Sequence, residues 1–273
     1  MMLKPRSSLA KYLNDLQSEG RVSFTSKQAR EKLGITNRTF LKAAERLQKQ
    51  KMLLNPRHGF YVAVPPQYLS WGAAPPAWYI DALMRHEARP YYVGLLKAAE
   101  LHGATHHAVM EFQVITDKQI PKIRAGRSII VFYYRKDFSH LRDGITEHKT
   151  DSGSMKISSP ELTAFDLLRY TRASGGIDAV ATVLSDLKDK LDGAKLKSLA
   201  TLFERSVIQR LGYLLDRLGR AEIADTLHEF LAAKKLLSWV ALQPQRRGRE
   251  KSDVFEKNAR WGVIVHRAPE IDE

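Results

Sequence analysis

The stretch that decides the fold is Ser23–Leu54, which reads SFTSKQAREKLGITNRTFLKAAERLQKQKMLL. A short helix is predicted directly behind Thr25 or Ser26, because either side chain can accept a hydrogen bond from the first helical turn. Gly34 is expected to end this helix, since glycine reaches the left-handed C-terminal conformation without steric cost. The chain can then start a second helix after only a short turn.

The second helix is predicted to begin behind Thr36, which can cap it in the same way. Its apolar residues recur at i, i+4 and i+7, as one buried stripe requires; they are Phe40, Ala44 and Leu47. Two helices joined by a turn of three to four residues make a helix-turn-helix. A plain three-helix packing unit shows the same pattern, so a functional interpretation needs further observations.

Polar and cationic side chains cover the other face of the second helix, where they can contact base edges and phosphates. A hairpin is predicted next, because apolar residues at 53–54 and 60–64 flank a turn at Asn55–Gly59. A basic hairpin behind such a helix is the wing of a winged helix, although His58 can also be a neutral turn residue. The predicted DNA-contacting residues are Lys27, Thr36, Asn37, Arg38, Thr39, Lys42, Arg46, Arg57 and His58.

The net charge of +14 is unevenly distributed along the 273 residues. Residues 1–64 hold 13 Lys and Arg against 4 Asp and Glu, whereas the remaining residues hold 31 against 26. Most of the positive excess therefore lies in the first quarter of the chain. A basic module on a nearly balanced body is what binding to a phosphate backbone requires.

The composition excludes several classes of protein. The chain has no cysteine, so it has no disulfide framework, zinc-thiolate site or cysteine nucleophile. Its N-terminus lacks the apolar region of a signal peptide, and no run approaches the roughly 18 apolar residues of a membrane span. We expect a soluble, cytoplasmic protein that does not associate with membranes.

The remaining sequence predicts an α+β protein in which a mixed domain follows the winged helix-turn-helix. We assign residues 1–64 to the DNA-binding domain, 65–76 to a Pro-rich linker and 77–273 to a second domain. The second domain is expected to open with helices at 77–87 and 91–101 and to contain a small sheet at about 109–158. A C-terminal helical bundle is expected at about 159–242, and a terminal strand at about 261–265.

Two local patterns support these assignments. Ser158 followed by Glu161 is typical of a capping box, with Pro160 in the first turn of the helix. Asp151–Gly153 lies between two β-prone runs and predicts a hairpin turn. Further on, Arg246–Arg249 is expected to form a basic loop.

Evidence for catalysis or metal binding is weak. His102 and His106 have the i, i+4 spacing of a helical zinc site, with His107 and Glu100 nearby, but Gly103 interrupts the helix between them. Phosphate-binding glycine loops and nucleophile-elbow motifs are absent from the sequence. We expect no enzymatic activity, no cofactor, no catalytic residues and no metal site.

A metal-dependent nuclease is the enzyme alternative, because basic DNA-binding proteins can carry clustered carboxylates for Mg²⁺. The candidate carboxylates are Glu111, Asp117, Glu161 and Asp166. Glu161 already has a structural role at a helix start. A ligand-responsive transcriptional regulator, with its effector site in the second domain, is a further alternative.

The second domain resembles the AbiEi-type antitoxin family. The resemblance rests on the order and spacing of four stretches, which are Tyr91–Ala104, Lys156–Tyr170, Ser174–Ile177 and Gln209–Asp216. It implies an N-terminal winged helix followed by a C-terminal antitoxin domain, and it supplies no catalytic residue.

The resemblance also implies a function. Such a protein is an antitoxin of a type IV toxin-antitoxin system, including systems in phage defence, and counters a nucleotidyltransferase-like toxin without a stable complex. It also represses its own operon by binding inverted repeats in double-stranded DNA. For this chain we expect monomers that cooperate only on DNA.

Overall fold

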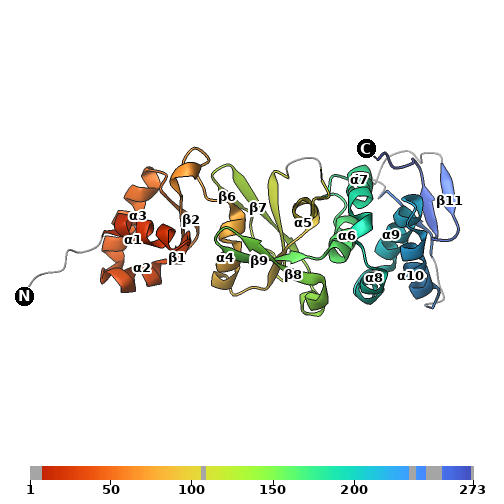
Figure 1. Ribbon diagram of the computed structural model, residues 1–273, viewed down its shortest axis with the longest axis horizontal. Coiled ribbons are helices and arrows are strands. Elements are labelled where there is room, and N and C mark those ends of the chain that lie inside the picture. Colours follow the sequence, from red (N-terminus) through yellow and green to blue (C-terminus); the bar gives the residue numbers. More distant parts are fainter. Residues whose placement is uncertain (1–7, 106–108, 234–237, 244–253, 272–273) are drawn as a thin grey trace, which may run out of the picture. The chain divides into compact units, whose positions relative to one another are not determined.

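The computed structural model describes residues 8–105, 109–233, 238–243 and 254–271 (Figure 1). Helices and strands are mixed along the chain, as the prediction of an α+β protein requires. The chain divides into two compact units. Unit 1 comprises residues 1–91, 110–136 and 147–156, and unit 2 comprises residues 92–109, 137–146 and 157–273.

Unit 1 begins with three helices, and the second and third start behind the predicted caps. Helix α1 (Leu9–Ser18) is capped by Ser8, and α2 (Ser26–Leu33) by Thr25, which forms a capping box with Gln28. Gly34 ends α2 at φ +61°, and the Thr36 side chain accepts a hydrogen bond from the first turn of α3 (Asn37–Lys49). These caps satisfy backbone N–H groups that have no partner within their own helix. The predicted pair of helices with a glycine turn is therefore present.

A three-stranded antiparallel sheet, in the order β1-β3-β2, completes this first part of unit 1. Its strands are β1 (Ser23–Thr25), β2 (Leu53–Arg57) and β3 (Phe60–Ala63). The turn is shorter than predicted, since β2 continues to Arg57 and leaves only His58 and Gly59 between the strands. The Asn55 side chain explains the difference, because its amide donates to the carbonyls of Arg57 and Phe60. Strand β1 was not predicted.

These elements share a hydrophobic core of their own, and we call residues 8–64 the N-terminal module. Phe24, Phe40 and Tyr61 lie at its centre, with Tyr61 stacked on Phe24 and edge-to-face with Phe40. The core residues all come from this part of the chain; they are Leu9, Leu13, Leu16, Phe24, Ala29, Phe40, Ala44, Leu47, Leu53, Tyr61 and Ala63. The predicted stripe of Phe40, Ala44 and Leu47 is thus confirmed.

The Pro-rich segment that follows, from residue 65 to Trp78, is packed against the rest of unit 1. It contains the short helices η1 (Pro66–Tyr68) and η2 (Pro76–Trp78), whose rings Tyr68 and Trp78 meet edge-to-face at 5.2 Å. Gly126 approaches this Pro-rich segment so closely that a Cβ atom at position 126 would lie 2.2 Å from the Trp71 carbonyl oxygen. Only glycine fits at position 126, which also has φ +57°.

A six-stranded sheet has the order β6-β7-β5-β4-β9-β8. The elements of this region are α4 (Ile80–His86), β4 (Tyr91–Val93), α5 (Leu95–Leu101), β5 (Glu111–Thr116), β6 (Ile123–Ala125), β7 (Ser128–Tyr134), η3 (Phe138–Gly144), β8 (Ile145–Thr150) and β9 (Gly153–Ser158). Strands β5 and β7 are parallel, and β6 joins β7 antiparallel. The predicted hairpin turn between β8 and β9 is present, whereas β6 was not predicted.

One predicted helix is wrong in its first turn. Residues 91–101 were expected to be helical throughout, but Tyr91–Val93 form strand β4 and the helix starts only at Leu95. Leu95 has φ +56°, which separates the two elements. All three strand residues are buried, and Val93 pairs with Ile157 of β9. Burial in a sheet therefore overrides the helical periodicity here.

Packed helices dominate the rest of unit 2. They are α6 (Pro160–Arg169), α7 (Ile177–Leu187), η4 (Lys188–Lys190), α8 (Gly193–Ala200), α9 (Arg205–Arg217) and α10 (Ala221–Ala232). Residues 191–192, 201–204 and 218–220 separate these helices. The bundle was expected to extend to about 242, but the last helix ends at Ala232 and residues 240–241 form a strand. Strands β10 (Val240–Ala241), β11 (Glu256–Asn258) and β12 (Val263–Val265) form a small sheet in the order β10-β12-β11. The predicted basic loop at 246–249 lies outside the described residues.

The predicted cap of α6 is displaced by one residue. Ser159, not Ser158, accepts the hydrogen bond from the Leu162 amide, and its hydroxyl donates to the Glu161 carboxylate. Ser158 is fully buried and its hydroxyl bonds to that of Thr163 at 2.7 Å. Because the two serines are adjacent, the sequence pattern does not show which of them caps the helix. The buried Ser158 bonds to Thr163, and Ser159 takes the capping position.

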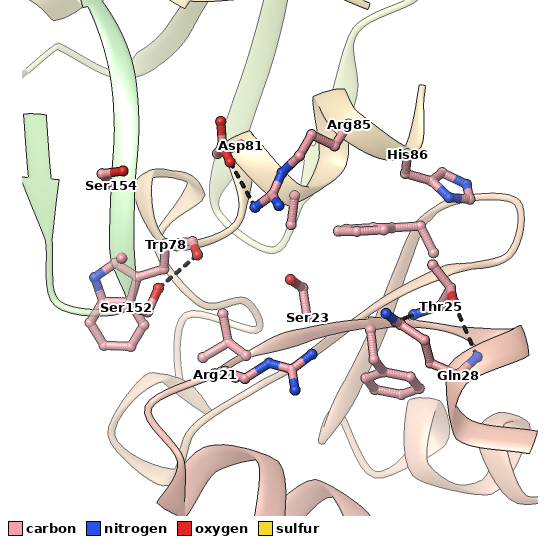
Figure 2. Close-up of a pocket in the computed structure, with 15 residues that line it drawn as sticks. Arg21, Ser23, Thr25, Gln28, Trp78, Asp81, Arg85, His86, Ser152 and Ser154 are labelled. Atoms are coloured by element: carbon pink, nitrogen blue, oxygen red, sulfur yellow. Dashed lines mark hydrogen bonds and ion pairs between the residues drawn. The ribbon is translucent and has the colours of Figure 1, made fainter. Parts of the chain in front are cut away.

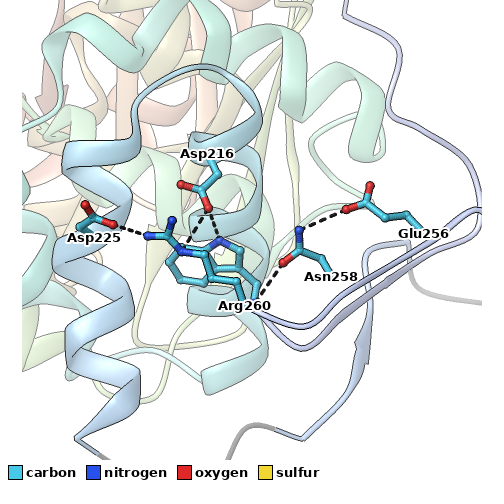
Figure 3. A network of polar contacts seen from close by, with 6 residues as sticks. Asp216, Asp225, Glu256, Asn258 and Arg260 are labelled. Atoms are coloured by element: carbon cyan, nitrogen blue, oxygen red, sulfur yellow. Dashed lines mark hydrogen bonds and ion pairs between the residues drawn. The ribbon is translucent and has the colours of Figure 1, made fainter.

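The C-terminal sheet is joined to α9 by the buried Trp261. The polar contacts of Arg260 with Asp216 and Asp225 lie beside it (Figure 3). The Trp261 ring occupies the space beside Gly212, where a Cβ atom would lie 2.1 Å from the ring. Its indole N–H donates to Asp216 at 2.6 Å, and the Arg260 guanidinium lies 5.5 Å from the ring centre. Arg260 also pairs with Asp216 and Asp225. Packing and charge together hold the segment at 258–265 against α9 and α10.

We predict that Gly212→Ala destabilises the protein by about 1–3 kcal/mol, the usual cost of overpacking. Without the contact to Trp261, the substitution would stabilise the protein, because alanine in a helix interior is more stable than glycine by about 0.5–1 kcal/mol. Urea unfolding followed by circular dichroism measures the difference. In Trp261→Leu, the same glycine change should become neutral or stabilising. An unchanged penalty in that background would contradict the assigned contact.

Candidate nucleic-acid interface

The outer face of α3 carries most of the predicted DNA-contacting residues. Arg38, Lys42 and Arg46 recur every four residues, so they project from one side of the helix. The buried residues Phe40, Ala44 and Leu47 hold the other side. Seven of the nine predicted residues lie in α2, α3 or the turn between them, and all seven are exposed; they are Lys27, Thr36, Asn37, Arg38, Thr39, Lys42 and Arg46.

The charges on this face are only partly compensated. Lys27 lies 4.0 Å from Glu31, and Lys49 lies 2.9 Å from Glu45. Among the described residues, no carboxylate forms an ion pair with the other three cations of α3, which are Arg38, Lys42 and Arg46. Cations without a protein counter-ion can exchange their solution counter-ions for phosphates. The face is therefore electrostatically suited to a polyanion.

Thr36 and Thr39 have structural roles at the start of α3. The Thr36 hydroxyl accepts from the Thr39 amide at 3.3 Å and lies 3.0 Å from the Thr39 hydroxyl. Leu41, which is 49% exposed on the same helix, was not singled out from the sequence. The sequence could have identified Leu41 as exposed, because it lies outside the buried i, i+4, i+7 stripe of α3. An exposed apolar side chain can contact the methyl group of thymine.

The two predicted wing residues are placed differently. His58 is exposed at the hairpin tip, and its carbonyl accepts a hydrogen bond from the ring of His86 on α4. The Arg57 side chain is only 22% exposed and lies 3.5 Å from Glu87. Its guanidinium also donates to the Pro121 carbonyl at 2.6 Å and lies 6.0 Å from the Phe132 ring centre. The structure thus ties Arg57 to other residues of unit 1.

The carboxylates weighed for a nuclease lie in unrelated surroundings. Glu161 accepts from Ser159 and from the Asp192 amide, and the fully buried Asp166 accepts from the Tyr92 hydroxyl at 2.7 Å. Asp117 pairs with Arg89 at 3.7 Å, whereas Glu111 is exposed on β5. Within the described ranges, no group of three histidine or carboxylate side chains is arranged to hold a metal ion.

The histidines weighed for a zinc site are only partly described. His102 ends α5, and its ring donates to the Ser158 carbonyl at 2.8 Å. Glu100 accepts from Lys97 and from the Val109 amide. His106 and His107 lie outside the described residues. Both described groups therefore have structural hydrogen bonds.

Comparison with known proteins identifies the class of the second part of the chain. Residues 92–217 match the sequence model of the AbiEi antitoxin C-terminal domain family, which confirms the resemblance drawn from the sequence. The match spans a little under half of the chain's length. The match supports an antitoxin role in a toxin-antitoxin system, and a toxin is the partner that such a role implies. No curated protein matches the chain.

The fold as a whole has a counterpart among solved structures. The crystal structure of the RV2827C protein from Mycobacterium tuberculosis aligns with a TM-score of 0.67 at 14% sequence identity. The alignment covers 96% of this chain and 93% of that one, so the likeness of fold extends along nearly the full length of both. Among the described residues, none of the helices is both long and apolar enough to cross a bilayer.

We predict that Arg57→Ala destabilises unit 1 by about 1–3 kcal/mol, because it removes a charged hydrogen-bond donor from partly buried acceptors. Thermal unfolding of the full chain measures this loss. Lys51→Ala is a suitable control, since Lys51 is an exposed cation next to the same hairpin. An Arg57→Ala protein as stable as the wild type would contradict the structural role of this side chain.

Proposed function

We propose that the protein is a DNA-binding antitoxin that represses transcription of its own operon. The observation that carries the proposal is the presence, in one chain, of an AbiEi antitoxin domain and a module with a separate core that presents a cationic helix to solvent. In this proposal residues 1–64 are a winged helix-turn-helix, 65–76 a linker and 77–273 the antitoxin domain. The β2–β3 hairpin takes the place of the wing.

Helix α3 acts as the recognition helix of this proposed domain. Its N-terminal residues Asn37, Arg38 and Thr39 would meet base edges, and Lys42 and Arg46 would neutralise phosphates. Lys27 and Thr36 extend the contact surface at the start of the two helices, and His58 extends it at the hairpin tip. Arg57 can join only by leaving Glu87 and Pro121. Inverted repeats in the operator would place two copies of the protein on the DNA.

The proposed partner is a nucleotidyltransferase-like toxin, as in type IV systems. The antitoxin domain would counter the toxin without a stable complex and without enzymatic activity, in the cytoplasm and in some cases in phage defence. The family that the domain resembles supports the toxin partner. The non-enzymatic role is supported by the buried carboxylates Asp166 and Glu161, which already have protein partners. DNA binding and toxin neutralisation are then separable tasks of one chain.

We predict that Arg38→Ala with Lys42→Ala weakens binding to the DNA upstream of the gene. Loss of the Lys42 phosphate contact should lower the slope of log K against log salt by about 0.9. Loss of the Arg38 base contact should cost a further binding free energy of about 1–3 kcal/mol at the specific site. Fluorescence anisotropy at several salt concentrations measures the slope. Lys11→Ala on α1 is the control, because Lys11 is also an exposed cation but lies outside the proposed surface. Unchanged affinity and slope in the double variant would show that α3 is not the recognition helix.

The same double variant tests whether the two tasks are separable. We expect it to lose repression of an operon-promoter reporter and still rescue growth when produced from an independent promoter together with the cognate toxin. Loss of both activities in a folded protein would contradict the division of tasks. Rescue that fails for the wild type as well would refute the antitoxin role.

A further inference from the structure

Unit 1 contains a groove that the proposed DNA interface does not use (Figure 2). Most of its lining comes from strand β1 with the residues before it, helix α4 and the β8–β9 turn. Gln28 of α2, Phe60 of β3 and Trp78 of η2 complete it. Its volume of about 650 Å³ falls within the range of small-molecule sites in proteins. The groove lies beside β1 and not on the exposed face of α3, so it is a feature of unit 1 separate from the proposed DNA interface.

Hydrogen-bond donors predominate in the groove. Arg21 lies on one wall and Arg85 on the other, and in the view of Figure 2 the Ser23 side chain is drawn between them. The hydroxyls of Ser23 and Ser154 form no hydrogen bond with any other described residue. The sole ion pair of Arg21 among these residues is with Glu19, at 3.7 Å, and both side chains are more than half exposed. Such an exposed pair contributes little, so Arg21 is available to an anion.

The one carboxylate in the groove already has partners. Asp81 accepts from Arg85 at 2.8 Å through one oxygen and from the Tyr91 hydroxyl at 3.0 Å through the other. Burial raises the pKa of Tyr91 well above its usual value, so this hydroxyl stays protonated and remains a donor. Asp81 thus positions Arg85, and its charge is balanced. The positive charge of Arg21 remains uncompensated within the groove.

An aromatic surface borders the charged part of the groove. Trp78 lies on the wall and is half-buried, with its backbone fixed by a hydrogen bond from Ser152 to the Trp78 carbonyl at 2.7 Å. Its ring is held edge-to-face against Tyr68. A fixed aromatic side chain beside arginines and hydroxyls can stack a planar ring while the donors bind a phosphate.

We propose that this groove binds a phosphate-bearing ligand of about mononucleotide size. Arg21 and Arg85 would hold the phosphate, Ser23 and Ser154 would donate to its oxygens, and Trp78 would contact the planar part. Because the walls come from the N-terminal module and from α4 with the β8–β9 turn, a bound ligand bridges them. The phosphate can belong to a free nucleotide or to a DNA strand, and the experiment distinguishes these two sources.

The first arm titrates the full-length protein with adenosine 5′-monophosphate, inorganic pyrophosphate and adenosine in a calorimeter. We expect the two phosphate compounds to bind and adenosine to bind at least about tenfold more weakly, since charge-assisted hydrogen bonds are lost. Arg21→Ala with Arg85→Ala should weaken binding of the monophosphate by about tenfold or more. Arg124→Ala, which removes an exposed cation of β6 in the same unit, is the matched control and should bind like the wild type.

The carboxylate provides a test in the opposite direction. Asp81→Asn removes a negative charge and loosens its hold on Arg85, so it should tighten binding of both phosphate compounds. A purely structural role of these residues would not produce a gain of affinity. Thermal unfolding of each variant verifies that it is folded.

The second arm measures anisotropy of a labelled non-specific duplex with the same variants. If the free compounds do not bind, but the Arg21→Ala, Arg85→Ala variant lowers the salt slope of DNA binding, the phosphate comes from DNA. The proposal is overturned if the free compounds fail to bind and that slope is unchanged. It is also overturned if the double variant binds the monophosphate as tightly as the wild type. Because Arg38 and Lys42 lie outside the groove, these outcomes do not depend on the proposed role of α3.

Discussion

The exposed face of α3 depends on the burial of one aromatic side chain, Phe40. Its ring meets that of Tyr61 edge-to-face at 5.1 Å, and Tyr61 in turn stacks on Phe24 of β1. Edge-to-face and offset ring pairs contribute beyond the area that they bury. Helix α3 therefore has one rotational position, in which Arg38 and Lys42 face water. The side chains proposed to contact DNA gain their orientation from a core that they do not touch.

The helix caps and the glycine that ends α2 were the most predictable features of the fold. Thr25, Gly34 and Thr36 act through local hydrogen bonds or through their own backbone conformation, so sequence alone suffices to place them. The exposed cationic face of α3 followed from the same periodicity that located its core. These are short-range rules, and the N-terminal module is built largely from them.

Features that depend on distant partners were missed. Tyr91–Val93 reads as helix until the neighbouring strands of the sheet are known, and β1 and β6 are only three residues long. The space for Trp261 exists because Gly212, far away in sequence, has no side chain. In the same way, the partners of Arg57 come from residues 87, 121 and 132, so its sequence position indicated an exposed hairpin tip. Periodicity carries no information about such long-range contacts.

The proposal depends most on one point, which is that the protein reads a specific DNA sequence through its N-terminal module. Footprinting of the full-length protein on the DNA upstream of its own gene, at physiological salt and with excess non-specific competitor, tests it most directly. The account predicts protection of an inverted repeat at protein concentrations that leave a shuffled sequence of equal composition unprotected. Equal protection of both sequences, or protection of neither, would contradict it.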